Sequence, residues 1–340
     1  MLRAAMPVSI GIMLAFLIAC NLTLTAKAAD TTPPLVLERT IPLAGVAGRI
    51  DHMAVDLTRN RLIIAELGNN TVDVIDLASG GIVHRILGLS EPQGVGYTLR
   101  ADIIAVANGG DGTVRLFRGG DLSPAGTISL GEDADDVWLE AATGRFIIGY
   151  GSGGIASVDP ASRAVAARLL LPAHPEAFAI DPTTQRIFVN LPDARQIAVL
   201  DIAAGAQVAA WRVPGLRGNF PMALDDSGAV LATVFRRPAR LVLLDSRTGG
   251  VMANLRSCDD ADDVFFDAGR HRLYVSCGEG VVDVFQRGTN GVHPLARVKT
   301  SAGARTSLYV PQLDRLFVAA RGGLPGSGSG PAILVFRPQS

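Results

Sequence analysis

Neither sign of charge predominates in this chain of 340 residues, which contains 31 Lys and Arg against 32 Asp and Glu. The formal net charge at pH 7 is -1. Binding to nucleic acid without sequence preference requires a positive field that neutralises many phosphates, and this chain lacks one. We therefore expect neither DNA nor RNA to be a partner.

Histidine and cysteine are scarce, with 5 and 3 residues, and they form no CxxCH motif. That absence excludes a covalently attached c-type haem. Long amphipathic segments with the helical period are also missing, which argues against a helical bundle. The chain instead contains 38 glycines and many short runs of β-branched and aromatic residues. This composition is typical of strands joined by tight turns.

Residues 1–29 have the features of a secretory signal peptide. Arg3 precedes an almost wholly apolar segment, Met6–Ala19, which has the length of a signal core and is short for a membrane span. Two cleavage sites remain open: a lipobox-like segment that would make Cys20 a lipidated first residue, or cleavage before Ala29. Both predict export to the periplasm or the cell-envelope surface.

Residues 35–340, which follow a short linker at 30–34, contain one unit seven times. Its clearest copy is Cys258–Gln286, with three strand-like runs. Equivalent positions recur every 41 to 44 residues, at His52, Gly94, Asp136, Ala177, Pro221, Asp263 and Ser307. So even a period predicts an all-β, seven-bladed propeller with four-stranded antiparallel blades. The last unit has only three strands, so we expect Leu35–Leu43 to complete it.

The strand motifs RLYVSCGEG, RIFVNLPDARQIAVLD and RLIIAELGNNTVDVIDL resemble those of the YVTN-repeat, YncE-like family of exported bacterial β-propellers. The resemblance covers essentially all of residues 35–340. It implies a WD40-like seven-bladed propeller in the periplasm or on the cell surface. It implies no particular reaction, because the shared motif consists of residues that pack the blades.

Cys258 and Cys277 lie 19 residues apart within the sixth unit. One precedes an innermost strand and the other ends the next strand, so antiparallel pairing brings both to the same edge of the blade. We predict a disulfide, which suits an oxidising compartment. Two free buried thiols or a metal-binding pair are the alternatives.

Polar residues gather where the chain enters the innermost strands, around the mouth of the central channel. Turn chemistry accounts for scattered Asp and Asn but does not require His, Gln and Glu at the same position. Exposed arginines also follow the second strands of blades five and seven, among them Arg236 and Arg321. We expect a ligand-binding ring formed by Asp51, His52, Gln93, Asp135, Asp136, His174, Glu176, Asn219, Asp262, Asp263 and Arg305.

The preferred hypothesis is a monomeric binding module that recognises a small polar ligand or a partner protein at this mouth. A metal-dependent lactonase or lyase is the alternative, in which His52, His174 and Glu176 are candidate ligands of a divalent metal. Asp51 or Glu176 is then the candidate general base. A third hypothesis is an accessory role in a periplasmic redox system. The ordinary alternative to all three is a solvated rim whose acids cap strand ends.

Overall fold

The computed structural model describes residues 1–2, 32–321 and 330–340. By internal contacts the chain divides into two units, Met1–Thr32 and Pro33–Ser340, and the second contains every strand. The predicted signal peptide, apart from residues 1–2, and its candidate lipidation site, Cys20, lie outside the described residues, as does most of the glycine-rich segment at 322–330. Within the described ranges, no helix is long and apolar enough to cross a membrane.

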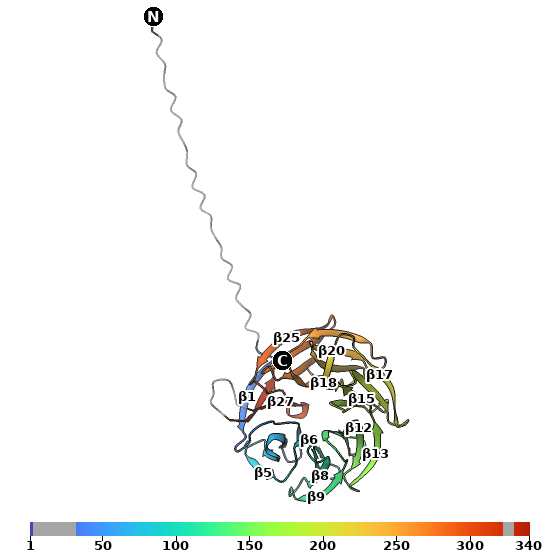
Figure 1. Cartoon of the computed structure of the whole chain (residues 1–340). Coiled ribbons are helices and arrows are strands. Elements are labelled where there is room, and N and C mark those ends of the chain that lie inside the picture. The colour runs from blue at the N-terminus through green and yellow to red at the C-terminus, as the bar shows by residue number, and fades with distance from the viewer. Residues whose placement is uncertain (3–31, 322–329) are drawn as a thin grey trace. The chain divides into compact units, whose positions relative to one another are not determined.

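Seven four-stranded antiparallel sheets form the blades of a propeller ring (Figure 1), which confirms the predicted fold class. The blades, from the innermost to the outermost strand, are as follows. Blade one is β2 (Met53–Asp56), β3 (Arg61–Glu66), β4 (Thr71–Asp76) and β5 (Ile82–Ile86); blade two is β6 (Pro92–Thr98), β7 (Ile103–Asn108), β8 (Thr113–Arg118) and β9 (Pro124–Ser129); blade three is β10 (Ala134–Glu140), β11 (Arg145–Tyr150), β12 (Gly154–Asp159) and β13 (Ala164–Leu170).

The remaining blades continue the same order. Blade four is β14 (Phe178–Asp181), β15 (Arg186–Leu191), β16 (Gln196–Asp201) and β17 (Ala206–Trp211); blade five is β18 (Arg217–Leu224), β19 (Val230–Arg237), β20 (Ala239–Asp245) and β21 (Val251–Arg256); blade six is β22 (Ala261–Asp267), β23 (Arg272–Cys277), β24 (Val281–Gly288) and β25 (Gly291–Lys299); blade seven is β26 (Ser307–Val310), β27 (Arg315–Ala320), β28 (Ala332–Pro338) and β1 (Leu35–Pro42). Two short 3-10 turns, η1 (Leu67–Asn69) and η2 (Pro311–Leu313), follow β3 and β26.

The N-terminal strand closes the ring. β1 pairs antiparallel with β28 as the outermost strand of blade seven, with Thr40 opposite Leu334. This pairing confirms the predicted completion of the last unit by the N-terminal strand.

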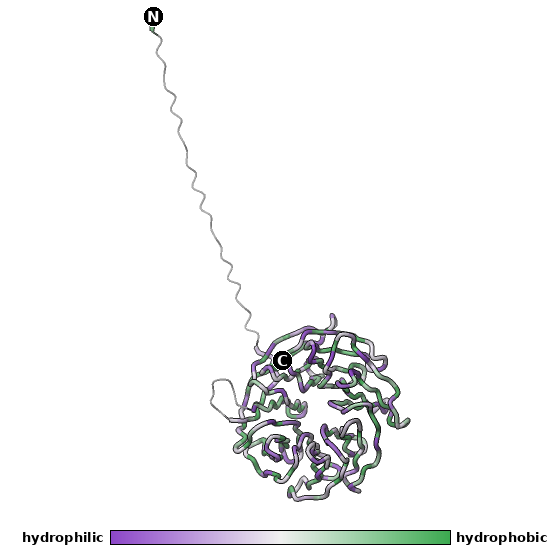
Figure 2. The backbone as a smooth tube through the Cα atoms, in the orientation of Figure 1, coloured by the Kyte–Doolittle hydropathy of each residue, from purple (hydrophilic) through white to green (hydrophobic). Residues whose placement is uncertain are grey.

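The core lies between the faces of neighbouring blades, because each sheet has two apolar faces that one blade cannot cover alone. Ile63 and Val74 of blade one, for example, pack in one cluster with Val95 and Ile104 of blade two. Figure 2 shows hydrophobic segments running through the blades around the ring.

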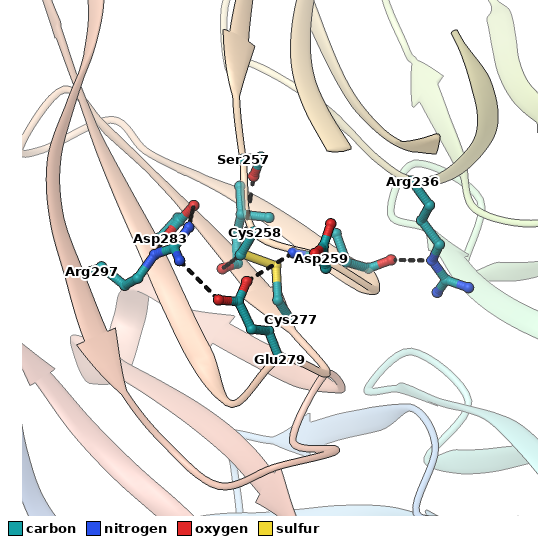
Figure 3. The surroundings of a disulfide bond; sticks show 10 residues. Arg236, Ser257, Cys258, Asp259, Cys277, Glu279, Asp283 and Arg297 are labelled. Atoms are coloured by element: carbon teal, nitrogen blue, oxygen red, sulfur yellow. Dashed lines mark hydrogen bonds and ion pairs between the residues drawn. A yellow bond between two sulfur atoms is a disulfide. The ribbon is translucent and has the colours of Figure 1, made fainter. Parts of the chain in front are cut away.

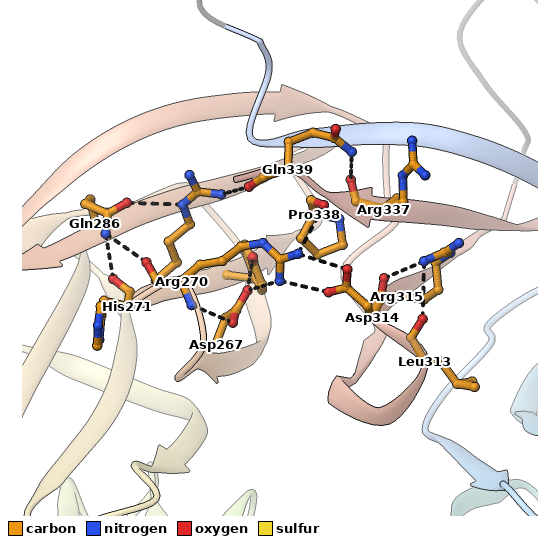
Figure 4. A network of polar contacts seen from close by, with 12 residues as sticks. Asp267, Arg270, His271, Gln286, Leu313, Asp314, Arg315, Arg337, Pro338 and Gln339 are labelled. Atoms are coloured by element: carbon orange, nitrogen blue, oxygen red, sulfur yellow. Dashed lines mark hydrogen bonds and ion pairs between the residues drawn. The ribbon is translucent and has the colours of Figure 1, made fainter.

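Arginine bridges join two pairs of blades at the end of the propeller where the first and second strands turn, which we call the turn end. In Figure 4, Arg270 of blade six donates to Asp267 at 3.2 Å and to both carboxylate oxygens of Asp314 in blade seven at 2.8 and 2.9 Å. Arg59 of blade one makes the same kind of bridge between Asp56 of its own blade and Asp102 of blade two. Charge-assisted bidentate bonds of this kind hold adjacent blades together.

Candidate functional site

The opposite end of the propeller carries the predicted mouth, and backbone bulges shape it. The register of the innermost strand shifts at its mouth end in blades two, three, five and six. In blade three the shift falls between Ala134 and Val137 and therefore includes Asp135 and Asp136. A bulge adds a residue and re-aims side chains. As a result, both consecutive acids of this strand line the same depression at the mouth.

A small depression of about 30 Å³ lies at the centre of the mouth. Its lining residues come from blades one, three, four, five and six. This space is sufficient for a water molecule or an ammonium group. The lining consists of Arg49, Asp51, His52, Asp135, Asp136, Glu176, Ala177, Phe220 and Asp262.

Two arginines and two aspartates form ion pairs on one side of the mouth. Arg236 of blade five donates to Asp262 at 2.5 Å, and its guanidinium lies 3.5 Å from the centre of the Phe220 ring. Arg305 pairs with Asp262 at 2.9 Å and donates to Asp260 at 3.0 Å. The positive charges that the sequence places here are therefore largely neutralised by carboxylates of blade six.

Acids outnumber basic groups on the side formed by blades three and four. The His174 Nδ1 atom lies 2.6 Å from the Gly151 carbonyl, and the ring lies 3.6 Å from both Asp133 and Asp135. A hydrogen bond with Asp135 raises the pKa of His174 to about 9, although burial acts to lower it. Burial and the nearby Asp135 raise the pKa of the Glu176 carboxyl to about 7. This carboxyl has too little positive charge around it to stay ionised easily.

A layer of charged groups separates the mouth from the channel below. Burial acts to lower the pKa of His52, but Asp136, Asp51 and Asp263 outweigh it and raise this pKa to about 10. Burial in turn raises the pKa of Asp136 to about 6 and that of Asp263 to about 7. Asp263 also accepts a hydrogen bond of 2.6 Å from the backbone N–H of Ser307. The layer thus holds an imidazolium ion beside carboxyl groups that titrate near neutral pH.

The remaining predicted residues occupy different surroundings. Asp51 is buried 2.8 Å from the Arg49 guanidinium, and burial raises the pKa of its carboxyl. Gln93 donates to Asp133 at the rim, at 3.1 Å. Asn219 is 1% exposed, and its amide donates to Asn190 at 2.8 Å and to the Gln196 carbonyl at 3.0 Å. Asn219 therefore joins blades four and five and does not line the depression.

Among residues 32–321 and 330–340, no group of three or more His, Cys, Asp or Glu side chains has the arrangement of a metal site. Of the three candidate ligands, His52 and Glu176 line the depression, and His174 lies close to Asp133 and Asp135. Each imidazole has carboxylates near it as counter-charges. The described geometry gives the metal-dependent enzyme no support.

The two cysteines lie at bonding distance beside the mouth, with Cα atoms 6.0 Å apart, which confirms the predicted pair (Figure 3). The bond joins the segment before β22 to the end of β23. A chain of polar contacts surrounds it: Glu279 accepts from the backbone N–H of Asp259 at 3.1 Å and from Arg297 at 2.9 Å. The staple therefore fixes the strand that presents Asp260, Asp262 and Asp263.

Sequence reasoning did not single out Phe220 or the ion pairs of Arg236. An aromatic residue at the start of one inner strand and an arginine after the next strand were the available signals. They point to a stacked pair only once the bulge in β18 is known, because that bulge decides where Phe220 projects.

No family model matches the chain, and no curated protein matches it in sequence. The likeness is to solved structures. A chain in the crystal structure of the mitotic checkpoint complex is similar with a TM-score of 0.77 and 12% identity, over 97% of this chain and 99% of that chain. The WD40 repeats of RRP9 give a TM-score of 0.76 with 10% identity, over 88% and 97% of the two chains.

A chain of hydrazine synthase from Kuenenia stuttgartiensis is also similar, with a TM-score of 0.72 and 14% identity, over 86% of this chain and 97% of that chain. At such low identities the three likenesses show a shared fold and nothing of activity. The WD40-like propeller is thereby confirmed. Membership of the YVTN-repeat, YncE-like family stays a prediction.

Proposed function

We propose that this protein is an exported binding module that recognises a small polar ligand or a partner protein through one projecting cationic group. The observation that carries the proposal is the excess of carboxyl groups on the side of the mouth formed by blades three and four. There the Glu176 carboxyl lines a depression of about 30 Å³.

An ammonium group suits this position. It supplies a positive charge beside the Glu176 carboxyl, and the depression of about 30 Å³ has room for it. Phe220 borders the same depression, with Arg236 stacked on its ring, and offers an apolar contact to the rest of the ligand. The side chain of lysine, or a terminal amine, is the simplest group with these properties.

Export remains part of the proposal and rests on the N-terminal segment. The cysteine pair supports it, because disulfides persist in oxidising compartments. Detergent partitioning of the wild-type protein and of Cys20→Ala tests the lipid anchor: loss of partitioning in the variant supports lipidation, and equal behaviour overturns it.

Calorimetric titration with the capped peptide Ala-Lys-Ala tests recognition at the mouth, with Ala-norleucine-Ala as the uncharged comparison. We expect the lysine peptide alone to bind the wild-type protein, and to bind Glu176→Gln about ten-fold more weakly. Because a bound cation lowers the pKa of Glu176, binding near pH 7 should release protons, which titrations in buffers of different ionisation enthalpy measure.

Glu140→Gln is the matched control, since Glu140 lies at the other end of the strand that carries Asp135. It should bind the lysine peptide as the wild type does. Equal binding of the norleucine peptide, or no binding at millimolar lysine peptide, would contradict the proposal. Elemental analysis of untagged protein tests the enzyme alternative. That alternative requires a near-stoichiometric divalent metal, which His174→Ala should remove.

A further inference from the structure

The central channel below the mouth contains a second and much larger cavity, of about 470 Å³. Its lining comes from the innermost strands of the seven blades and reaches Asp226 and Pro311 at the turn end. His52 and Asp136 line both this cavity and the mouth depression, so the charged layer separates the two. A cavity of this size is within the range of small-molecule sites.

Apolar side chains form much of the wall of this channel cavity. Trp138 remains 40% exposed although it lies on the innermost strand of blade three. Phe266, Val55 and Leu308 line the cavity and are only partly buried. Aromatic side chains contribute large apolar contact areas, so an uncovered Trp on a cavity wall is a ready contact for an aromatic ring.

The end of the cavity next to the mouth is polar. His52, Asp136, Asp263 and Ser307 meet there. The buried Ser307 hydroxyl has no hydrogen-bond partner among the described residues. Donors and acceptors are thus available to a molecule in the cavity.

The charges at this end select the head group of such a molecule. One imidazolium lies beside two carboxyl groups there, so a charged head group of either sign meets a like charge and must also lose its hydration. A neutral group that both donates and accepts hydrogen bonds, such as a hydroxyl or an amide, can satisfy both kinds of partner. The cavity therefore favours a different chemistry from the mouth above it.

We propose that the central channel is a second binding site, which takes a small aromatic molecule with a neutral hydroxyl or amide head group. The aromatic body packs against Trp138 and Phe266, and the head group reaches His52, Asp136 and Ser307. This site goes beyond the recognition of a cationic group at the mouth and does not depend on it.

Calorimetric titration with 2-naphthol, 2-naphthoate and 2-naphthylmethylammonium tests the proposal. We expect one equivalent of 2-naphthol to bind, and both charged probes to bind at least about ten-fold more weakly. Asp136→Asn removes one of the charges that repel an anion, so it should reduce the difference in affinity between 2-naphthoate and 2-naphthol. No binding at millimolar 2-naphthol, or equal affinities for the three probes, overturns the proposal.

Substitutions in the wall of the channel cavity test where 2-naphthol binds. Trp138→Ala should weaken 2-naphthol binding about ten-fold through lost apolar contact. Leu170→Ala is the matched control, because Leu170 is 79% exposed on an outermost strand, and it should bind as the wild type does. Thermal melts of both variants confirm folding. Unchanged binding by Trp138→Ala overturns the site, and so does competition between 2-naphthol and the lysine peptide, which occupies the mouth.

Discussion

The two ends of the propeller use the same residue types, aspartate and arginine, with opposite results for the acids. At the turn end, Arg59 neutralises Asp102: its hydrogen bonds, with that of Tyr97, lower the pKa of Asp102 even though burial acts to raise it. At the mouth, burial and neighbouring acids raise the pKa values of Glu176, Asp136 and Asp263.

This difference in pKa distinguishes acids that hold blades together from acids whose charge is not balanced within the protein. An acid with a lowered pKa is already satisfied by its partners and stabilises the fold as an anion. An acid with a raised pKa destabilises the fold when ionised, and a bound cation removes that cost. The mouth is therefore the end at which a ligand gains most from the charges present.

Removing the disulfide should have the largest effect on stability. The bond lies beside the mouth, and among the described residues the turn end has no such covalent link. Cys258→Ala with Cys277→Ala opens a link across 19 positions, and we expect a loss of about 3 kcal/mol in the free energy of unfolding. Urea denaturation of the oxidised wild type and the variant measures it. If both cysteines of the native protein react with an alkylating agent before reduction, the pairing is wrong.

The arginine bridge at the turn end should give the next largest effect. Arg270→Met leaves Asp267 and Asp314 without their shared partner, and we expect a loss of about 2 kcal/mol in the free energy of unfolding. Arg145→Met is the matched control, because that side chain is 42% exposed and its partner, Asp159, lies 4.0 Å away and is 31% exposed. Its loss should be below about 1 kcal/mol. Equal losses would contradict a special role for the bridge.

The last pair of variants tests the contrast in pKa between the two ends through the pH dependence of stability. Asp263 has a folded pKa of about 7, above its unfolded value, so the folded state binds more protons and stability falls as pH rises from about 4 to 7. Asp263→Asn should therefore gain stability relative to the wild type between pH 4 and pH 8, although loss of the counter-charge to His52 offsets part of that gain. The variant can still accept the hydrogen bond from Ser307.

Asp102→Asn should change the pH dependence of stability in the opposite direction in the same denaturation experiment. Because the pKa of Asp102 is lowered, its contribution is present above the unfolded pKa and lost as pH falls. The variant should be less stable than the wild type at pH 8, and this deficit should shrink as the pH falls from about 5 toward 2. The same sign for both variants would remove the contrast between the two ends.

The sequence predicts the fold far better than the site, for a physical reason. A period of 41 to 44 residues and three strands in the last unit are enough to predict seven blades closed by the N-terminal strand. The direction of a side chain at the mouth depends instead on bulges, which leave no clear mark in composition. Asp135 and Asn219 both lie at such positions, yet Asp135 lines the depression while Asn219 bonds between blades.

The pairing of β1 with β28 also has a kinetic consequence. Thr40 meets Leu334 only after nearly the whole chain has been made, so this contact has the greatest separation along the sequence of any strand pair described. Loops of that length close slowly, and blade seven should therefore be the last to become protected from hydrogen exchange during refolding. Until then β28 presents an unpaired edge, and the nascent protein depends on rapid capture of its own first strand to avoid pairing with another molecule.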